Sequence, residues 1–332
     1  MKILLLTRKD VIAAGGADIR GIIPVIEEVF KIHAKKDYCQ PLKPYLRIPG
    51  DKEGKRIIAM PAYLGGEFKV WGIKWIASNP TNPFKRNLER ASAIIILNDL
   101  ETGFPVAIME GAIISATRTA AVAAVAAKYL TRKNPTLIGI IGAGMIARSV
   151  IDGLCIVKKE VQQAKVFDLN SSRSKLFCNE LRKKLGIEIN VASNAEEAIR
   201  EADIVVPATT ATKPYIEGEW IKPGALFINI SLRDPKFSVV QHVNKIVVDD
   251  WNQANRENTV LHLMYEQGLL KDSDIHAEMG EIILGAKVGR ENEDEIIFFN
   301  PMGMAIEDIG VASIVYNRSK HMALGSYIDL WY

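Results

Sequence analysis

The chain of 332 residues lacks the features that mark several large protein classes. It has only three cysteines, Cys39, Cys155 and Cys178, with no paired metal spacing. An odd count without such spacing argues against a disulfide framework and against a cysteine zinc site. The five histidines are scattered and also show no metal-ligand spacing, so we predict no metal.

The chain also lacks an excess of charge of one sign. Its 42 Lys and Arg residues are nearly balanced by 39 Asp and Glu residues, for a formal net charge of +3. This balance gives no reason to expect a nucleic acid or an anionic membrane as partner. The densest basic cluster, Arg182-Lys183-Lys184, is interpreted as the solvated face of a helix.

Long hydrophobic runs are missing as well. The apolar part of Met1–Arg8 is too short for a signal peptide, and the run Ala120–Ala127 is too short to span a bilayer. The sequence therefore predicts a cytoplasmic protein without a membrane partner.

What the chain does have is length and apolar content for two domains. We expect residues 1–115 to form an α+β domain for substrate binding and dimerisation. Residues 116–309 show a β-α-β alternation from Leu137 onward, which predicts a Rossmann domain with a doubly wound parallel sheet. The apolar, aromatic end of the segment 310–332 is expected to return to the first domain. The fold class is α/β.

The predicted elements follow from hydrophobic periodicity and turn residues. Helices are expected at Ile19–Ala34, at the alanine-rich stretch Ala116–Leu130, after the glycine turn, between several of the later strands and near the end of the chain. Strands are expected in the first domain at 3–6, 45–48, 56–59, 70–77, 93–99 and 104–109, and in the second at 137–141, 164–168, 203–207, 225–230, 245–248 and 295–299.

The sequence Gly142-Ala143-Gly144-Met145-Ile146-Ala147 is a Gly-x-Gly-x-x-Ala turn between a buried strand and an amphipathic helix. In that context it predicts dinucleotide binding. Gly142 permits the tight turn, Gly144 lets the backbone approach the pyrophosphate, and the first amides of the helix face the anion.

The next predicted strand ends in Asp168, where an acid is expected to bind the ribose hydroxyls, roughly 20 residues beyond the turn. A carboxylate there accepts a hydrogen bond from the 2′-hydroxyl and repels a 2′-phosphate. NAD is therefore predicted rather than NADP, although Arg173 could in principle offset the charge.

Polar residues also follow two later strands of the predicted parallel sheet. Thr209 follows one strand, and Ser231 and Asp234 follow the next. Rossmann ligands bind at this carboxyl edge. Hydroxyl groups there can hold the ribose, but such polar loop ends are also common without a ligand.

Three cations in unusual surroundings are candidates for an acidic substrate. Arg47 follows a rigid Pro-containing stretch, Lys74 has apolar and aromatic neighbours, and Arg118 lies among small residues. Arginine matches carboxylates through its fixed fork of donors, and a desolvated lysine can act as a base. Solvated surface positions are the alternative for all three.

The order of these motifs resembles the ornithine cyclodeaminase/μ-crystallin family along nearly the whole chain. The resemblance rests on Arg47, Gly72-Ile73-Lys74, Leu97-Asn98-Asp99, Arg118-Thr119-Ala120-Ala121, the turn at Gly142 and Gly303-Met304-Ala305-Ile306-Glu307-Asp308. A nearer resemblance, to dehydrogenases of N-(2-amino-2-carboxyethyl)-L-glutamate within the family, rests on QPLKPYLR at 40–47, RIIAMP at 56–61, GIKWI at 72–76, KRNLERAS at 85–92, VVDDW at 247–251 and NPMGMAIEDI at 300–309.

The resemblance implies a homodimer that pairs through the sheets of its first domains. It implies substrate contacts from Arg47, Lys74, Arg118 and Met302. The resemblance and the glycine turn together imply a set of cofactor contacts. These are Ser92, Arg118, Gly142, Gly144, Met145, Ile146, Asp168, Thr209, Ser231, Lys236 and Pro301.

Two positions depart from the family pattern. Leu232-Arg233 replaces the Gly-Gly that precedes the catalytic Asp of ornithine cyclodeaminase, although Asp234 itself aligns with that Asp. Arg90 stands where other members have a cofactor-binding Thr, so only the nearby Ser92 is carried over.

The expected reaction is NAD-dependent oxidative cleavage of N-(2-amino-2-carboxyethyl)-L-glutamate to L-2,3-diaminopropionate and 2-oxoglutarate, for a siderophore or peptide natural product. Lys74 is the first candidate for the catalytic base and Asp234 the second. The alternatives are ornithine cyclodeaminase, alanine dehydrogenase, imine reductase, or a μ-crystallin-like protein that binds a dinucleotide and a small ligand.

Overall fold

The structure is a computed structural model, and it describes residues 2–231 and 233–331 except for the side chain of Phe84. Two compact units account for its internal contacts, Met1–Arg118 with Gly303–Tyr332, and Thr119–Met302. The sequence-based boundaries lay at residues 116 and 310. Each unit is described by itself below.

The first unit is built around an eight-stranded mixed sheet, sheet A. Its elements are β1 (Lys2–Leu6), α1 (Arg8–Ala13), α2 (Ile19–Ala34), β2 (Tyr38–Cys39), β3 (Tyr45–Arg47), β4 (Arg56–Leu64), β5 (Val70–Ser78), α3 (Asn82–Lys85), β6 (Ala91–Asn98), β7 (Pro105–Glu110), the start of α4 (Ala112–Leu130), α12 (Ala305–His321) and β16 (Ser326–Asp329). The strand order is β16-β1-β7-β6-β5-β4-β2, and β3 also pairs with β4.

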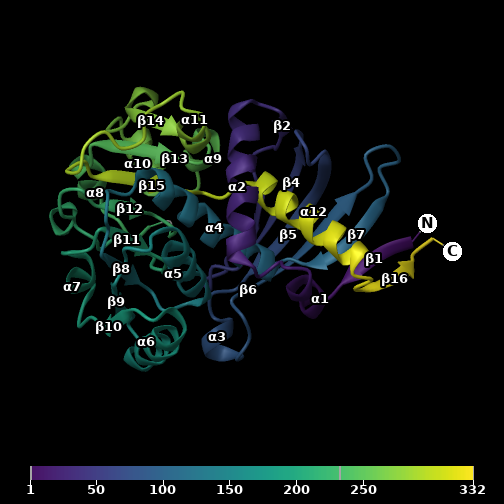
Figure 1. The fold of residues 1–332 in the computed structure, drawn as a ribbon, viewed down its shortest axis with the longest axis horizontal. Coiled ribbons are helices and arrows are strands. Elements are labelled where there is room, and N and C mark those ends of the chain that lie inside the picture. The colour runs from purple at the N-terminus through teal and green to yellow at the C-terminus, as the bar shows by residue number, and fades with distance from the viewer. Residues whose placement is uncertain (1, 232, 332) are drawn as a thin grey trace. The chain divides into compact units, whose positions relative to one another are not determined.

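The two ends of the chain meet in sheet A. Strand β16 pairs with β1 in antiparallel register, with Lys2 opposite Asp329. Strands β1 and β7 are parallel. Helix α12 crosses β4, β5 and β6 and packs on α2 (Figure 1). The last 30 residues of the chain therefore belong to the same core as the first strands.

Sheet A has two unlike faces, because side chains alternate along each strand. In β5, Val70, Lys74 and Ser78 are buried, while Trp71 and Trp75 on the opposite face are 40% and 46% exposed. Because Lys74 contacts α12, the buried side is the one that α12 covers. We call it the inner face, and the side with the tryptophans the outer face.

The second unit contains an eight-stranded parallel sheet, sheet B. Its elements are the rest of α4, β8 (Leu137–Ile141), α5 (Met145–Val157), β9 (Gln163–Phe167), α6 (Ser171–Leu185), β10 (Glu188–Val191), α7 (Ala195–Ile199), β11 (Ile204–Pro207), η1 (Gly218–Trp220), β12 (Leu226–Ile228), α8 (Phe237–His242), β13 (Lys245–Val248), α9 (Trp251–Ala254), α10 (Val260–Glu266), η2 (Asp272–Asp274), β14 (Ile275–Glu278), α11 (Met279–Ile283) and β15 (Ile297–Asn300).

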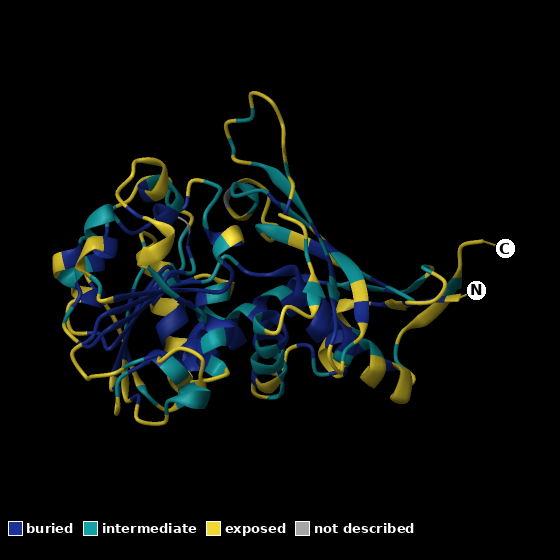
Figure 2. Ribbon diagram, turned by 90° about the horizontal axis from the view of Figure 1, so that it is seen from above, coloured by how far each residue is buried: buried dark blue, intermediate teal, exposed yellow. Residues whose placement is uncertain are grey.

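The strand order of sheet B is β10-β9-β8-β11-β12-β15-β13-β14. The first five strands follow the 3-2-1-4-5 part of the order of a doubly wound Rossmann sheet, and β15, the last strand of the sheet in chain order, lies next to β12. The central strands are buried along their whole length, as the dark blue ribbons in Figure 2 show. The predicted doubly wound fold is thus confirmed, and β8 and β11 flank the point where the strand order reverses.

Helix α4 is long and apolar enough to cross a membrane by length and composition. However, 72% of its most apolar window is buried inside the protein, as is common for a helix in a protein core. Glu110 caps its start, because the carboxylate accepts hydrogen bonds from the amides of Ala112 and Ile113 at 3.0 and 3.2 Å.

Candidate functional site

The glycine turn of the second unit joins β8 to α5. Gly142 has a φ of +95°, and a Cβ atom there would lie 2.6 Å from the carbonyl oxygen of Ala208, which follows β11. Only glycine fits both the left-handed conformation and this close approach. The turn is therefore fixed at the carboxyl edge of sheet B, where Rossmann ligands bind.

Gly144 is the N-cap residue of α5, and it faces open space. A Cβ atom there would meet no atom within 4 Å, and the described side chains provide no cap for this helix. The first amides of α5 are therefore available to an anion, which the helix dipole also favours. Met145, 45% exposed, begins the helix, and Ala147 is fully buried against the sheet. This arrangement fits the pyrophosphate of a dinucleotide.

Asp168 follows β9 directly and is hydrogen-bonded to the glycine turn. One carboxylate oxygen accepts from the amide of Ala143 and the other from the amide of Asn170, both at 2.8 Å. The guanidinium of Arg173 lies 4.0 Å from the carboxylate. Asp168 is thus held beside the turn, and Arg173 offsets part of its charge.

Two of the predicted polar loop residues, Thr209 and Asp234, contact each other. The Thr209 hydroxyl donates to the Asp234 carboxylate, which is fully buried. Burial raises the pKa of Asp234, and the hydrogen bond from Thr209 opposes that rise. The Asp234 backbone carbonyl accepts from the amides of Tyr215 and Ile216 at 2.9 and 3.0 Å, so the residue also fastens its own loop.

The remaining predicted residues of the second unit lie along the same carboxyl edge. The Ser231 amide donates to the carbonyl of Pro207 at 3.2 Å, which links the ends of β11 and β12. Lys236 forms an ion pair with Glu217. Pro301 and Met302 follow β15, whose last residue, Asn300, accepts a 2.7 Å hydrogen bond from Asn229. Leu232 lies outside the described residues, so the altered Leu232-Arg233 pair is not placed.

In the first unit, Lys74 is the central buried cation. Its ammonium lies 2.5 Å from Asp308 of α12 and 3.4 Å from the hydroxyl of Ser115. Lys74 is 1% exposed and Asp308 is fully buried. Burial lowers the pKa of Lys74 to about 8, even though the Asp308 carboxylate raises it.

Arg118 joins the same cluster from α4. Its guanidinium donates to Glu307 at 2.7 Å and to Asp308 at 3.1 Å. The first turn of α12 thus supplies two carboxylates to two buried cations, and acids are favoured at that end of a helix. Asp308 and Glu307 were quoted in a family motif, but the sequence reasoning gave them no role. Their partners lie almost 190 residues or more earlier in the chain, so no local spacing links them.

Gly303 begins the turn that leads into α12. It has a φ of +78°, and a Cβ atom there would lie 2.6 Å from a guanidinium nitrogen of Arg118. The buried ammonium of Lys43 donates to the Gly303 carbonyl at 2.7 Å. Lys43, another residue that sequence reasoning missed, therefore helps to seat the turn that carries Asp308 and Glu307.

Arg47 and Ser92 are placed differently from Lys74. Arg47 is exposed at the end of β3, its guanidinium 4.8 Å from the ring centre of Tyr45. Its register partner is Arg56, which lies on the inner face like Lys74. Ser92 is opposite Ala77 and is exposed on the outer face, so the structure does not bring it to the Lys74 cluster.

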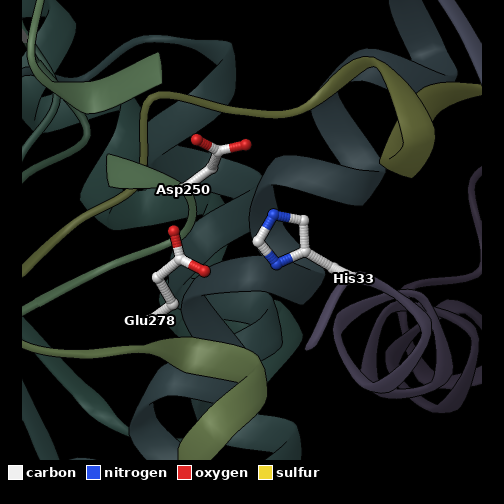
Figure 3. A group of neighbouring side chains, drawn as sticks. All are labelled: His33, Asp250 and Glu278. Atoms are coloured by element: carbon white, nitrogen blue, oxygen red, sulfur yellow. The ribbon is translucent and has the colours of Figure 1, made fainter. Parts of the chain in front are cut away.

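Asp250 and Glu278 of the second unit have local structural contacts. Asp250 caps α9 by accepting from the amide of Gln253 at 3.1 Å, and Glu278 accepts from the amide of Trp251 at 3.0 Å. Figure 3 draws both carboxylates, together with His33, which belongs to α2 of the first unit.

Residues 5–322 match the model of the ornithine cyclodeaminase/mu-crystallin family. The chain belongs to this family. It is 40% identical to the N-((2S)-2-amino-2-carboxyethyl)-L-glutamate dehydrogenase of Staphylococcus aureus over 99% of both chains. The family resemblance inferred from the motifs is thereby confirmed.

Two solved structures share the fold along at least 98% of the chain. The Δ(1)-pyrroline-2-carboxylate reductase of Thermococcus litoralis, in complex with NADH and L-proline, has a TM-score of 0.93, 34% identity, and coverage of 98% of this chain and 100% of its own. An archaeal alanine dehydrogenase dimer with bound NAD has a TM-score of 0.89, 33% identity, and full coverage of both chains.

Proposed function

We propose that this protein is an NAD-dependent oxidoreductase that cleaves N-(2-amino-2-carboxyethyl)-L-glutamate to L-2,3-diaminopropionate and 2-oxoglutarate. The observation that carries the proposal is the 40% identity to the S. aureus dehydrogenase over 99% of both chains. In the balanced reaction, substrate, NAD⁺ and water give diaminopropionate, 2-oxoglutarate, NADH and a proton. Bound NAD⁺ supplies the hydride acceptor.

The second unit holds the cofactor in this proposal. The amides of the Gly142–Ile146 turn face the pyrophosphate, and Asp168 accepts from the ribose hydroxyls. Thr209, Ser231, Lys236 and Pro301 line the same edge of sheet B, while Arg118 and Ser92 are cofactor contacts proposed for the first unit.

Lys74 is the proposed catalytic base. With a pKa of about 8, a substantial fraction of its amine is neutral near that pH and can accept the proton of the substrate's secondary amine. Asp308 orients the amine, and Arg47, Arg118 and Met302 are the other proposed substrate contacts. Asp234 is the second candidate for the base, because burial raises the pKa of its carboxyl group.

The direct test is to incubate the purified protein with NAD⁺ and the glutamate adduct. We expect NADH absorbance to rise in step with 2-oxoglutarate and diaminopropionate, both identified by chromatography. Parallel reactions with L-alanine, with ornithine (assayed for proline) and with a cyclic imine plus NADH test the other activities of the family. NADH formation from alanine but not from the adduct contradicts the proposal.

Alanine dehydrogenase is the second candidate, because the archaeal enzyme matches the whole chain at 33% identity. A third possibility is a μ-crystallin-like protein that binds a dinucleotide and a small ligand without catalysis. Such a protein would retain cofactor in the purified sample and turn over none of these substrates. The same set of assays therefore separates all three possibilities.

The choice of NAD over NADP is proposed to depend on Asp168. We expect the wild type to bind NAD⁺ at least roughly 10-fold more tightly than NADP⁺, because the carboxylate accepts from the 2′-hydroxyl and repels a 2′-phosphate. Asp168→Ala should reduce this preference, as measured by titration calorimetry with both nucleotides. Asn170→Ala, which changes the neighbouring N-cap of α6, is the control. An NADP⁺ preference in the wild type contradicts this assignment.

We also propose a cytoplasmic homodimer that pairs through the outer face of sheet A. That face presents Trp71, Trp75 and Ile94, each at least 40% exposed. A continuous apolar surface of this kind is typical of an interface. Light scattering should give a dimer mass for the wild type and a smaller one for Trp75→Arg. Leu169→Arg, at a residue 95% exposed in the second unit, should leave the mass unchanged.

The product, diaminopropionate, is proposed to supply a siderophore or a peptide natural product. A neighbouring gene for a cysteine-synthase-like enzyme that forms the adduct from O-phosphoserine and glutamate would support this role.

A further inference from the structure

A second group of cations lies on the inner face of sheet A, beyond the Lys74 cluster. Arg56 of β4 is the register partner of Ser78 in β5 and of Arg47 in β3. Ser78 follows Lys74 by four residues in the same strand, so both side chains point to the same face. Arg56 therefore shares the face on which Lys74 contacts α12.

Arg90 completes this group from the segment that precedes β6. Its guanidinium donates to the Ser78 hydroxyl at 2.9 Å. Burial lowers the pKa of Arg90, and the positive charge of Arg56 lowers it further. The Nε atom of Arg56 is itself buried and has no hydrogen-bond partner among the described residues. Two guanidinium groups thus lie near each other, and the Nε–H of Arg56 is available to donate a hydrogen bond to a ligand.

Among the residues that the structure describes, no carboxylate lies within ion-pair distance of Arg56 or Arg90. The nearby acids are bound to other cations. Glu89, next to Arg90 in sequence, accepts from Arg8 at 2.7 and 2.6 Å, and Glu53 pairs with Lys85 at 2.5 Å. Partly buried like charges without counter-charges are unfavourable, and an anionic ligand would remove that cost.

An apolar row separates the two cationic groups. Ile58 of β4 is opposite Ile76 of β5, and both lie on the inner face between the Lys74 row and the Arg56 row. Both isoleucines are only partly buried, so they leave apolar surface for a ligand. Four residues at about 3.3 Å per residue place the Lys74 and Ser78 rows roughly 13 Å apart. A five-carbon diacid with a hydrogen bond beyond each carboxylate can bridge that distance.

Arg56, Ser78 and Arg90 also line a cavity of about 600 Å³, whose other walls include Leu46, Ile57, Ala77 and Ser92 at the end and on the outer face of the sheet, so a ligand can reach both guanidinium groups. We propose that Arg56 and Arg90 bind the side-chain carboxylate of the substrate's glutamate part. Its two methylene groups lie over Ile58 and Ile76, and its α-carboxylate points toward Lys74. The pair thereby selects a diacid of this length over a small amino acid such as alanine. The identity of the full substrate rests on the proposed function.

Binding of a simple ligand tests the pair without any turnover. 2-Oxoglutarate carries the distal carboxylate, and 2-oxovalerate has the same carbon chain without it. In calorimetry with NADH present, the wild type should bind 2-oxoglutarate roughly 10- to 100-fold more tightly, the range expected for a hydrogen-bonded charge. Arg56→Met and Arg90→Met should lose most of this preference and leave 2-oxovalerate binding unchanged.

Arg86→Met is the matched control, because Arg86 is an exposed arginine on the same segment. It should keep the full preference. If Arg56→Met does not fold, the proposal is still tested by the affinities of the wild type and of Arg90→Gln for 2-oxoglutarate and 2-oxovalerate. Equal affinity of the wild type for both ligands, or an undiminished preference in Arg90→Met, overturns the proposal.

Kinetics separate this inference from the proposed function. With the glutamate adduct, Arg90→Met should lower kcat/KM roughly 10- to 100-fold, mainly through KM, because the contact is present in ground and transition state alike. With the glutamine adduct, which lacks only the charge, wild type and variant should be similar. If the wild type turns over neither adduct, the proposed function fails, while the 2-oxoglutarate binding still tests the arginine pair. Equal losses on both adducts would show a structural role and overturn the assignment.

Discussion

The inner face of sheet A carries two cationic groups that differ in how their charge is balanced. Lys74 and Arg118 are buried, and the carboxylates of Asp308 and Glu307 lie within 3.1 Å of them. Arg56 and Arg90 are partly buried, and the described residues place no carboxylate beside them. The first group is close to neutral as a whole, whereas the second is positive.

This difference changes how the cations of the sequence should be interpreted. Lys74 and Arg118 stand out in the sequence because their neighbours are small or apolar, and we expected them to attract an acidic substrate through their charge. In the structure their charges are largely balanced by carboxylates of α12, which hold both side chains in place, and burial lowers the pKa of Lys74. The uncompensated charge lies at Arg56 and Arg90.

The largest expected effect is the loss of the proposed base in the balanced group. Lys74→Met keeps the side-chain volume and removes the amine, so kcat with the glutamate adduct should fall by roughly 10²- to 10⁴-fold. NAD⁺ binding should be unchanged, because the glycine turn belongs to the second unit. Lys175→Met, at an exposed lysine of α6, is the control for an ordinary loss of charge. Normal turnover by Lys74→Met would remove Lys74 from the mechanism.

The next prediction concerns stability. Asp308→Asn leaves Lys74 and part of Arg118 without their counter-charge, so the free energy of unfolding should fall by about 3–5 kcal/mol in urea titrations. Glu89→Gln breaks the exposed ion pair with Arg8 and should cost less than about 1 kcal/mol. Similar losses in the two variants would show that the buried group is not held by its charges.

The pH dependence of the reaction tests whether the Asp308 carboxylate raises the pKa of Lys74. If Lys74 must be neutral to accept a proton, kcat/KM should rise with pH and level off above about 8, the pKa of Lys74. The Asp308 carboxylate favours the ammonium form and so raises this pKa. Asp308→Asn should therefore move the rise to lower pH, by about 1 unit. A rise that stays in place or moves to higher pH argues that another group, such as Asp234, is the base.

Much of the fold could be predicted from the sequence because its signals are local. The apolar positions of Ile19–Ala34 repeat with a helical period, and the helix has those bounds. The glycine turn, Asp168 and the doubly wound order also follow from neighbouring residues. Strands β10 (Glu188–Val191) and β14 (Ile275–Glu278) were missed, because both are short edge regions of sheet B with few buried residues.

The sites were less predictable where their parts are distant in the chain. Lys74 and Asp308 are 234 residues apart, and only the path of α12 across β4, β5 and β6 brings them together. The same holds for Arg56 and Arg90, whose proximity depends on strand register and on a loop. Sequence composition near each residue indicates a cation, but it does not indicate whether a carboxylate will reach it.

The smallest expected effect is also the one that distinguishes the two groups most directly. In Arg90→Met the repulsion from Arg56 is relieved and only the hydrogen bond to Ser78 is lost. The free energy of unfolding should therefore stay the same or rise by up to about 1 kcal/mol, although 2-oxoglutarate binding weakens. Adding 2-oxoglutarate should stabilise the wild type more than the variant, since a ligand stabilises only the state that binds it. A loss of several kcal/mol in Arg90→Met without ligand would mean that Arg90, like Lys74, is balanced within the protein, and the contrast between the two groups would disappear.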